Sequence, residues 1–408
     1  MIVLLERHLI WSSPDGTTHY YYYDEITWVV AIVAVVWLTW ILVSRYRRAQ
    51  ALRRRPRRAD YRQLKRVIKA KDELSARFLQ PGVSRTIHAV GIGRLTASND
   101  YCIQIFISDP NEELWVGAGA ATLPNSYLGI PLTVYIMPVA GFMSDAGLPY
   151  PNGIREHQEV IVGGISGANS NLTGESGTIG YFCTRKSKLP RPNQLYLLSN
   201  THVLADVGKP GIDDSDLIMQ PSPGERTGNR PIGALVNFSP IVFDGNLETP
   251  NRIDAAIAKL WGTQQHKLVI PLIGTVDGFV EKKDIQLGEA VCKFGRTTGY
   301  TEGCIFSIYL DIWIRYDRTG QSAFFKDQLL IEPSQPAFPK FVRPGDSGSL
   351  VSDQHQHAIG LIFGGTSEVP AGTAANSPGH NLQTIQGCGV ANPISEVLEK
   401  LKIELARE

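Results

Sequence analysis

Short apolar runs separated by glycine and proline fill the sequence beyond residue 155. The runs have the length of β-strands and lie at residues 177–183, 195–199, 253–260, 290–294, 303–308, 328–331, 349–351 and 358–363. Many short strands joined by tight turns are typical of β-sandwiches and closed barrels. The 39 glycines and 25 prolines of the 408-residue chain also favour turns over long helices. The sequence therefore predicts a mainly β protein.

Three further apolar runs, at residues 86–92, 101–107 and 130–138, predict a small α/β or β domain over residues 84–155. Gly91-Ile92-Gly93 in the first run resembles part of a dinucleotide-binding loop. The third glycine of such a loop and the helix after it are missing, so a nucleotide site is not expected.

Two segments have apolar residues at helical spacing. The first, residues 59–80, predicts an amphipathic helix within a basic connector that covers residues 45–83. The second predicts a C-terminal helix over residues 396–408 that packs on the sheets. Its apolar stripe consists of Ile394, Val397, Leu398, Leu401 and Leu405.

Residues 26–43 form an uncharged apolar run that is long enough to cross the hydrocarbon core of a bilayer as a helix. A cleaved signal peptide would need a basic start, whereas the charged residues within 1–25 are mainly acidic. The sequence therefore predicts a single transmembrane helix over residues 26–44, preceded by a short extracytoplasmic N-terminus over residues 1–25.

Positive charge follows this apolar run directly. Residues 45–71 contain many arginines and lysines and a single acidic residue, Asp60, although the formal net charge of the chain is only +1. Because positively charged flanks stay on the cytoplasmic side, we expect the C-terminal part to face the cytoplasm. Residues 26–58 are expected to contact membrane lipids, as a plain stop-transfer flank or with recognition of anionic head groups. The basic residues adjoin the apolar run rather than a folded domain, so nucleic-acid binding is not expected.

The cysteines are widely spaced and form no Cys-x-x-Cys pair; they are Cys102, Cys183, Cys292, Cys304 and Cys388. We expect them to be free thiols in a reducing compartment. His355 and His357 could ligate a metal, but no cluster of acids or cysteines completes a site beside them. Neither a metal nor another cofactor is therefore expected.

The segment Gly345-Asp346-Ser347-Gly348 carries the most specific chemical signal in the chain. Its glycines allow a tight backbone turn that can aim the N–H groups of Gly345 and Ser347 at one oxygen. Acyl transfer by a serine needs such donors, together with a base and a group that orients the base. Ser347 is therefore the candidate nucleophile, and Gly345 and Ser347 form the candidate oxyanion hole.

His202 and Asp254 are the candidates for the other two roles. His202 lies at the end of the apolar run 195–199, where a lone histidine is more often a structural residue, but its placement before Ser347 favours a catalytic base. Asp254 enters the apolar run 253–260, where a lone carboxylate is costly unless it has a partner. Asp254 is thus the candidate that orients His202.

The order His202, Asp254, Ser347 and the Gly-Asp-Ser-Gly signature resemble the trypsin and chymotrypsin family. Leu-Ser-Asn-Thr-His-Val-Leu-Ala and Gly-Arg-Thr-Thr-Gly at residues 295–299 are similar to an intracellular trypsin-like branch of bacterial proteins and plant narrow leaf proteins. The resemblance implies two six-stranded antiparallel β-barrels in residues 156–395, with a Ser-His-Asp triad in the cleft between them. It also implies cleavage of peptide bonds through an acyl-enzyme.

The same resemblance places the floor of the substrate pocket at Phe341, so the acidic floor that selects Lys or Arg is absent. Arg343 in the same loop, together with Gly364 and Gly365, completes the expected pocket. An apolar or shallow pocket is therefore expected.

Secreted relatives are activated by cleavage before an Ile-Val-Gly-Gly sequence, whose new amine pairs with the aspartate before the serine. Residues 161–164 have this sequence, but Val160 precedes it instead of Arg or Lys. Asp346 could therefore be satisfied by the backbone or by another side chain.

These expectations combine into a membrane-anchored, regulated serine endopeptidase with a protein or peptide substrate. A role in cellular defence is suggested by the bacterial relatives. The alternative is a catalytically latent protease fold that serves as a scaffold or binding module at the membrane. A homo-oligomer is left open.

Overall fold

The computed structural model describes residues 9–12, 18–21, 58–84, 86–108, 123–142, 155–186, 194–207, 211–225, 228–316, 319–367 and 383–407. The segment 26–44, for which a transmembrane helix is predicted, lies outside these residues. Within the described ranges, no helix combines the length and the apolar character that a membrane span requires.

The chain divides into two compact units, residues 1–57 and residues 58–408. In the first unit, β1 (Leu9–Ser12) and β2 (Thr18–Tyr21) pair as an antiparallel hairpin. The second unit contains all the other elements described below.

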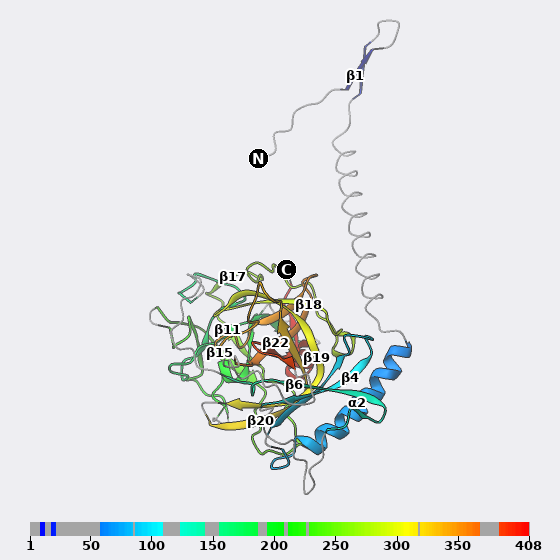
Figure 1. The fold of residues 1–408 in the computed structure, drawn as a ribbon. Coiled ribbons are helices and arrows are strands. Elements are labelled where there is room, and N and C mark those ends of the chain that lie inside the picture. The colour runs from blue at the N-terminus through cyan, green and yellow to red at the C-terminus, as the bar shows by residue number, and fades with distance from the viewer. Residues whose placement is uncertain are drawn as a thin grey trace. The chain divides into compact units, whose positions relative to one another are not determined.

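Helix α2 (Arg58–Phe78) opens the second unit and confirms the predicted amphipathic helix. Its buried side chains, among them Leu64, Val67 and Leu74, recur on one face, which packs on two neighbouring strands, β3 (Ile87–Arg94) and β4 (Tyr101–Ile107). Figure 1 shows α2 beside β4 at the edge of this unit.

A seven-stranded sheet carries the first half of the candidate site. Its strands, in spatial order, are β10 (Ala168–Asn169), β14 (Leu217–Gln220), β15 (Arg230–Phe238), β16 (Ala256–Leu260), β13 (Tyr196–Ser199), β12 (Tyr181–Arg185) and β25 (Ile403–Leu405). Helix α3 (Thr201–Leu204) follows β13 directly. The buried side chains of this sheet form one apolar core with those of the C-terminal helix.

A twelve-stranded sheet carries the second half. Its main path runs β18 (Ala290–Gly295), β21 (Leu350–Asp353), β22 (Ala358–Gly365), β24 (Gly389–Pro393), β20 (Gln321–Pro333), β19 (Gly299–Tyr316), β3, β4, β6 (Ile130–Ile136) and β23 (Gln383–Thr384). Strand β18 also pairs with β19. Each strand from β18 to β19 along this path is therefore hydrogen-bonded to two others of the same group, and the path is closed. Strands β5 (Ser126–Tyr127) and β7 (Gly141–Phe142) pair with this sheet off the main path.

The remaining elements are short. Two small strand pairs are β8 (Val160–Ile161) with β17 (Gln265–His266), and β9 (Ile165–Ser166) with β11 (Thr178–Ile179). A 3₁₀ turn, η1, covers Lys282–Asp284. Strands thus outnumber helices in the described part of the chain, which confirms the predicted mainly β fold with few helices.

The three strands predicted in residues 84–155 are present as β3, β4 and β6. They continue the sheet that begins with β18, since β3 pairs antiparallel with β19 through Ile308↔Ile92 and Ile312↔Ala89. In the structure this segment therefore shares a sheet with residues 156–395, and its assignment to a separate domain stays a prediction.

The C-terminal helix is shorter than predicted. Helix α4 spans Ile394–Leu401, and Lys402 then adopts the left-handed conformation that ends it. Ile403 and Leu405 are buried on alternate positions of β25, which pairs antiparallel with β12. The prediction of a helix through residue 408 was wrong because the apolar stripe fits the helical period up to Leu401 and the strand period afterwards.

Candidate active site

His202 and Asp254 meet at the end of the seven-stranded sheet. His202 lies in α3 after β13, and Asp254 lies just before β16, the neighbour of β13. His202 Nδ1 and Asp254 Oδ2 are 2.6 Å apart, and the His202 backbone N–H donates to Asp254 Oδ1 over 3.3 Å. An ionised carboxylate only accepts hydrogen bonds, so this contact favours the tautomer with the proton on Nδ1, in which Nε2 is the basic nitrogen of the ring.

The backbone around Asp254 is held by buried amide side chains. Asn200 Nδ2 donates to the Asp254 carbonyl oxygen over 2.7 Å, and the Asp254 N–H donates to Asn392 Oδ1 over 3.0 Å. The Asp254 side chain is fully buried, whereas that of His202 is 12% exposed. The histidine therefore faces outward from an oriented, water-excluded acid.

Tyr316 is a residue of this site for which the sequence offered no signal. It ends β19, is buried, and donates from its hydroxyl to Asp254 Oδ2 over 2.9 Å. Burial and the neighbouring Asp254 raise the pKa of Tyr316 well above 10.0, so the hydroxyl keeps its proton.

The loop that contains Ser347 is fixed from the other side by β11. Thr178 N–H donates to the Ser347 carbonyl oxygen and Thr178 Oγ1 donates to that of Gly345, each over 2.8 Å. A Cβ at Gly348 would collide with the Thr178 carbonyl oxygen and with Ser199 Oγ, and its φ of +96° also favours glycine. Because Ser199 ends the strand that leads into α3, the loop lies against the segment that carries His202.

The expected oxyanion donors belong to this loop. Gly345 has a φ of +90°, while Asp346 N–H donates to the Arg343 carbonyl oxygen over 3.0 Å. Among the described residues, no hydrogen bond is formed by the backbone N–H of Gly345 or of Ser347.

Asp346 is fully buried and has several donors. Its carboxylate accepts from the N–H groups of Thr297, Thr298 and Arg343 over 2.9–3.1 Å. Lys293 Nζ lies 3.3 Å from Asp346 Oδ2, and both side chains are fully buried. Burial lowers the pKa of Lys293 and Asp346 raises it in part, so that it stays below 10.5. Asp346 is thus satisfied by backbone and by another side chain, as the sequence had left open.

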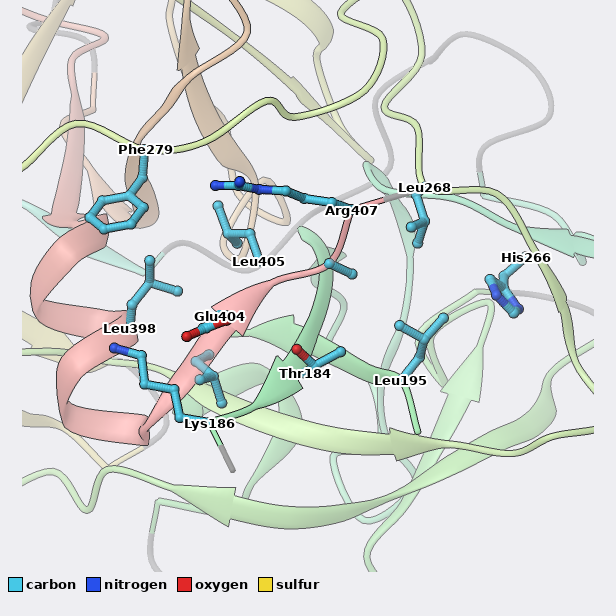
Figure 2. Close-up of a pocket in the computed structure, with 12 residues that line it drawn as sticks. Thr184, Lys186, Leu195, His266, Leu268, Phe279, Leu398, Glu404, Leu405 and Arg407 are labelled. Atoms are coloured by element: carbon cyan, nitrogen blue, oxygen red, sulfur yellow. The ribbon is translucent and has the colours of Figure 1, made fainter. Parts of the chain in front are cut away.

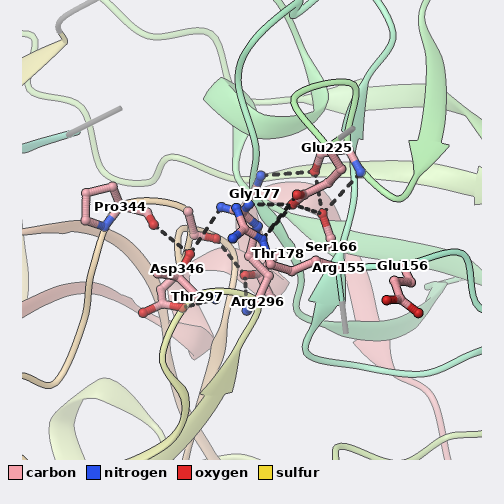
Figure 3. Close-up of polar contacts among 12 residues, drawn as sticks. Arg155, Glu156, Ser166, Gly177, Thr178, Glu225, Arg296, Thr297, Pro344 and Asp346 are labelled. Atoms are coloured by element: carbon pink, nitrogen blue, oxygen red, sulfur yellow. Dashed lines mark hydrogen bonds and ion pairs between the residues drawn. The ribbon is translucent and has the colours of Figure 1, made fainter. Parts of the chain in front are cut away.

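A second buried ion pair supports the same loop. Arg296 is 1% exposed and pairs with Glu225, which also pairs with Arg155 at 3.1 Å. A Cβ at Gly345 would collide with Arg296 Nη1, so the guanidinium lies directly against the loop. Figure 3 shows Glu225, Arg296, Thr297 and Asp346 converging between the two sheets.

The residues predicted to form the substrate pocket differ in burial and in surroundings. Phe341 is fully buried, and a Cβ at Gly303 or Gly389 would lie 2.8 Å from its ring, so it is tightly enclosed in the core. Arg343 is half-buried. Gly365 ends β22 and pairs antiparallel with Gly141 of β7. Their role in a pocket stays a prediction.

A cavity of about 880 Å³ lies elsewhere, between β25, β12 and α4. Figure 2 shows Leu398, Leu405 and Arg407 at its wall. His202, Asp254 and Ser347 are not among its lining residues.

Of the two histidines considered as metal ligands, His357 contacts Asp353, with 3.1 Å between Nδ1 and Oδ2. Three acidic residues, Asp72, Asp311 and Asp327, come close to one another elsewhere in the described part of the chain. Lys71 Nζ lies 2.8 Å from both Asp72 and Asp311, so an ammonium group already occupies that cluster.

Residues 247–406 match the family described as Nal1 C-terminal domain. The chain is 27% identical over 214 residues to Protein NARROW LEAF 1 of Oryza sativa subsp. japonica. The predicted resemblance to plant narrow leaf proteins is confirmed. The matched region covers 47% of the chain but only 34% of the rice protein, so the chain spans about a third of that relative.

Bacterial proteases are also similar in structure. Protease A of Thermobifida fusca is 17% identical and aligns over 61% of the chain and 100% of its own, with a TM-score of 0.39. The Nocardiopsis protease is 19% identical and aligns over 60% of the chain and 99% of its own, with a TM-score of 0.38.

Proposed function

We propose that the chain is a serine endopeptidase in which Ser347 attacks a substrate carbonyl, His202 transfers the proton and Asp254 orients His202. The backbone N–H groups of Gly345 and Ser347 would stabilise the oxyanion. The substrate class is a protein or peptide, and no cofactor takes part in these steps.

The contact between His202 Nδ1 and Asp254 Oδ2 carries this proposal. At 2.6 Å, beside a fully buried carboxylate, it selects one tautomer and stabilises the imidazolium that forms when Nε2 accepts a proton. A histidine that served only to fill the core would not need a buried acid on one nitrogen and partial exposure on the ring. The adjoining Ser347 loop, held by Thr178, supports the same role.

The proposal includes a finer description of the fold. The closed path β18-β21-β22-β24-β20-β19 supports a six-stranded barrel in the C-terminal half, as expected for a chymotrypsin-like enzyme. The seven-stranded sheet would supply the other barrel. Anchoring by residues 26–44, with the catalytic part facing the cytoplasm, remains part of the proposal on the strength of the sequence alone.

The proposal can be tested by labelling the full chain with a fluorophosphonate, which reacts with activated serines. We expect the wild-type protein to be labelled and Ser347→Ala to remain unlabelled. Ser170 is a half-buried serine remote from this motif in sequence, and its hydroxyl donates to the Ser215 carbonyl oxygen over 2.9 Å. Ser170→Ala is the matched control and should be labelled like the wild type.

Equal labelling of Ser347→Ala and the wild type would contradict the assignment of the nucleophile. If the folded wild-type protein is not labelled at all, the alternative of a latent protease fold that acts as a scaffold is favoured instead.

A further inference from the structure

Tyr316 joins the His202–Asp254 pair from the opposite sheet. It is the last residue of β19, its side chain is 2% exposed, and its hydroxyl donates to Asp254 Oδ2 over 2.9 Å. Oδ2 is also the oxygen that contacts His202 Nδ1. The same carboxylate oxygen is therefore contacted by a residue of α3, which follows the seven-stranded sheet, and by a residue of the twelve-stranded sheet.

The tyrosine ring is held rigidly. It meets the Phe243 ring edge-on at 5.1 Å, stacks on Phe325 at 6.5 Å and lies at 87° to the His202 ring at 6.1 Å. Its neighbour in the backbone, Arg315, donates from its N–H to the Ala140 carbonyl oxygen over 3.1 Å. The hydroxyl is thus delivered to Asp254 by a side chain with little freedom to move.

A carboxylate can rotate about its last bond, and a rotated Asp254 would lose the 2.6 Å contact with Nδ1. The His202 backbone N–H holds Oδ1 only weakly, at 3.3 Å. The Tyr316 hydroxyl supplies the second fixed donor, and burial keeps this hydroxyl protonated. The two donors together define the plane of the carboxylate.

We propose that Tyr316 is a positioning residue of the active site, whose hydroxyl fixes the Asp254 carboxylate so that Oδ2 faces His202 Nδ1. This inference rests on the proposed function and assigns to the site a fourth side chain, contributed by the sheet that also carries Ser347. Tyr316 acts through Asp254 and touches neither the substrate nor the reacting atoms.

The test measures the second-order rate constant for modification of Ser347 by a fluorophosphonate as a function of pH, in the full chain. Tyr316→Phe keeps the ring contacts and removes only the hydroxyl. We expect the plateau rate constant to fall by about tenfold, as for loss of a hydrogen bond to a charged group.

We also expect the acid limb of the pH profile to move to higher pH. Asp254 Oδ2 contacts His202 Nδ1, and the Tyr316 ring lies edge-on to the His202 ring. Without the hydroxyl, the Asp254 charge is shared with fewer donors and stabilises positive charge beside it more strongly, which moves the acid limb of the rate profile to higher pH. If the Tyr316 hydroxyl only stabilised the fold, Tyr316→Phe would lower the amount of folded protein and leave the acid limb of the pH profile unchanged.

Tyr181→Phe is the matched control. Tyr181 is 1% exposed and its hydroxyl donates to the Leu268 carbonyl oxygen over 2.9 Å, so the variant also removes one buried tyrosine hydroxyl. Its folded fraction should react at the wild-type rate and with the wild-type pH profile.

A wild-type rate and profile for Tyr316→Phe, in protein whose Ser347 is labelled, would overturn the role of Tyr316 and leave the proposed function standing. Failure of the wild type itself to react would overturn the proposed function, and the inference about Tyr316 would fall with it.

Discussion

Lys293 Nζ lies 3.3 Å from Asp346 Oδ2 in a place where both side chains are fully buried. Asp346 precedes the proposed nucleophile, so the ion pair braces the backbone that would bind the oxyanion. Lys293 belongs to β18, within the chain, whereas Ile161 is a buried residue of β8 paired with His266. Lys293 therefore supplies the positive charge beside Asp346. This ion pair forms without the new amine that cleavage before Ile161 would produce.

Replacing Lys293 with methionine should destabilise the protein by about 3–5 kcal/mol, because the Asp346 charge is left buried without its partner. We expect a lower denaturant midpoint in equilibrium unfolding and a slower reaction of Ser347 with a fluorophosphonate. The exposed residue Lys283 provides the control, since Lys283→Met should change neither quantity.

The double variant Lys293→Met/Asp346→Asn removes both charges and should recover part of the lost stability. An unchanged midpoint in Lys293→Met would contradict a structural role for the ion pair.

Asp254→Asn keeps the shape of the side chain but presents an amide to His202. Because an amide N–H facing Nδ1 favours the wrong tautomer, we expect the fluorophosphonate rate constant to fall by about 10,000-fold, while the fold is retained. Far-ultraviolet circular dichroism and the labelling rate are the two measurements. Labelling within tenfold of the wild type would argue that Asp254 does not orient the base.

Gly345 combines a left-handed backbone with a crowded surrounding. Its φ is +90°, and a Cβ there would collide with Arg296 Nη1 and Thr297 Oγ1. We expect Gly345→Ala to cost about 1–3 kcal/mol of folding free energy and to abolish labelling of Ser347, because the loop must shift.

Gly174 has a similar φ of +84° with nothing within 4 Å of its Cβ position. Gly174→Ala should therefore cost only the backbone strain, about 1 kcal/mol, and leave labelling intact. Equal labelling of the two alanine variants would show that crowding at Gly345 does not matter to the site.

The direct contact between His202 and Asp254 could be predicted because each residue stands out locally. A lone acid in an apolar strand requires a partner, and the histidine follows a buried strand within a family motif. Lys293 carries the same kind of signal, since it is a lone cation within the apolar run 290–294, and this argument could have identified the partner of Asp346.

Tyr316 could not be found in this way. It is one of several aromatic residues in a long apolar strand, and its contact with Asp254 depends on how the two sheets meet. Nor does the sequence show that β3 continues the sheet of β19, because apolar runs predict strands but not the neighbours with which they pair.

Buried thiols predict a loss of stability at alkaline pH. Burial raises the pKa of Cys183 above its ordinary value of 9.0, so the folded state retains a proton that the unfolded state releases. The protonated Cys183 thiol contributes fully to the free energy of unfolding below about pH 9. This contribution is lost as the pH rises further, with a slope of up to about 1.4 kcal/mol per pH unit. Unfolding in urea between pH 8 and pH 10 should show this decline.

Cys183→Ala should make the decline shallower. Leu197→Ala, on the neighbouring strand β13, also leaves a space in the core but removes no titrating group. It should lower the free energy of unfolding equally at every pH. If the free energy of unfolding fell with pH equally steeply in the wild type and in Cys183→Ala, the decline would not come from the Cys183 thiol.

Lys71 fastens α2 to the twelve-stranded sheet. Its Nζ is fully buried and lies 2.8 Å from Asp311 Oδ2 on β19. Burial lowers the pKa of Lys71, and Asp311, Asp72 and Asp327 raise it by more, so that it ends above 10.5. The ammonium group therefore stays charged at neutral pH and neutralises a buried acid.

Lys71→Met should destabilise the protein by about 3–5 kcal/mol and increase amide hydrogen exchange in α2, because Asp311 loses its counter-charge. Lys69 lies on the exposed face of the same helix. Lys69→Met changes the charge and the helix propensity in the same way, and should leave both the stability and the exchange of α2 unchanged. Matching exchange rates in the two variants would mean that the apolar face of α2, rather than the buried ion pair, holds the helix on the sheet.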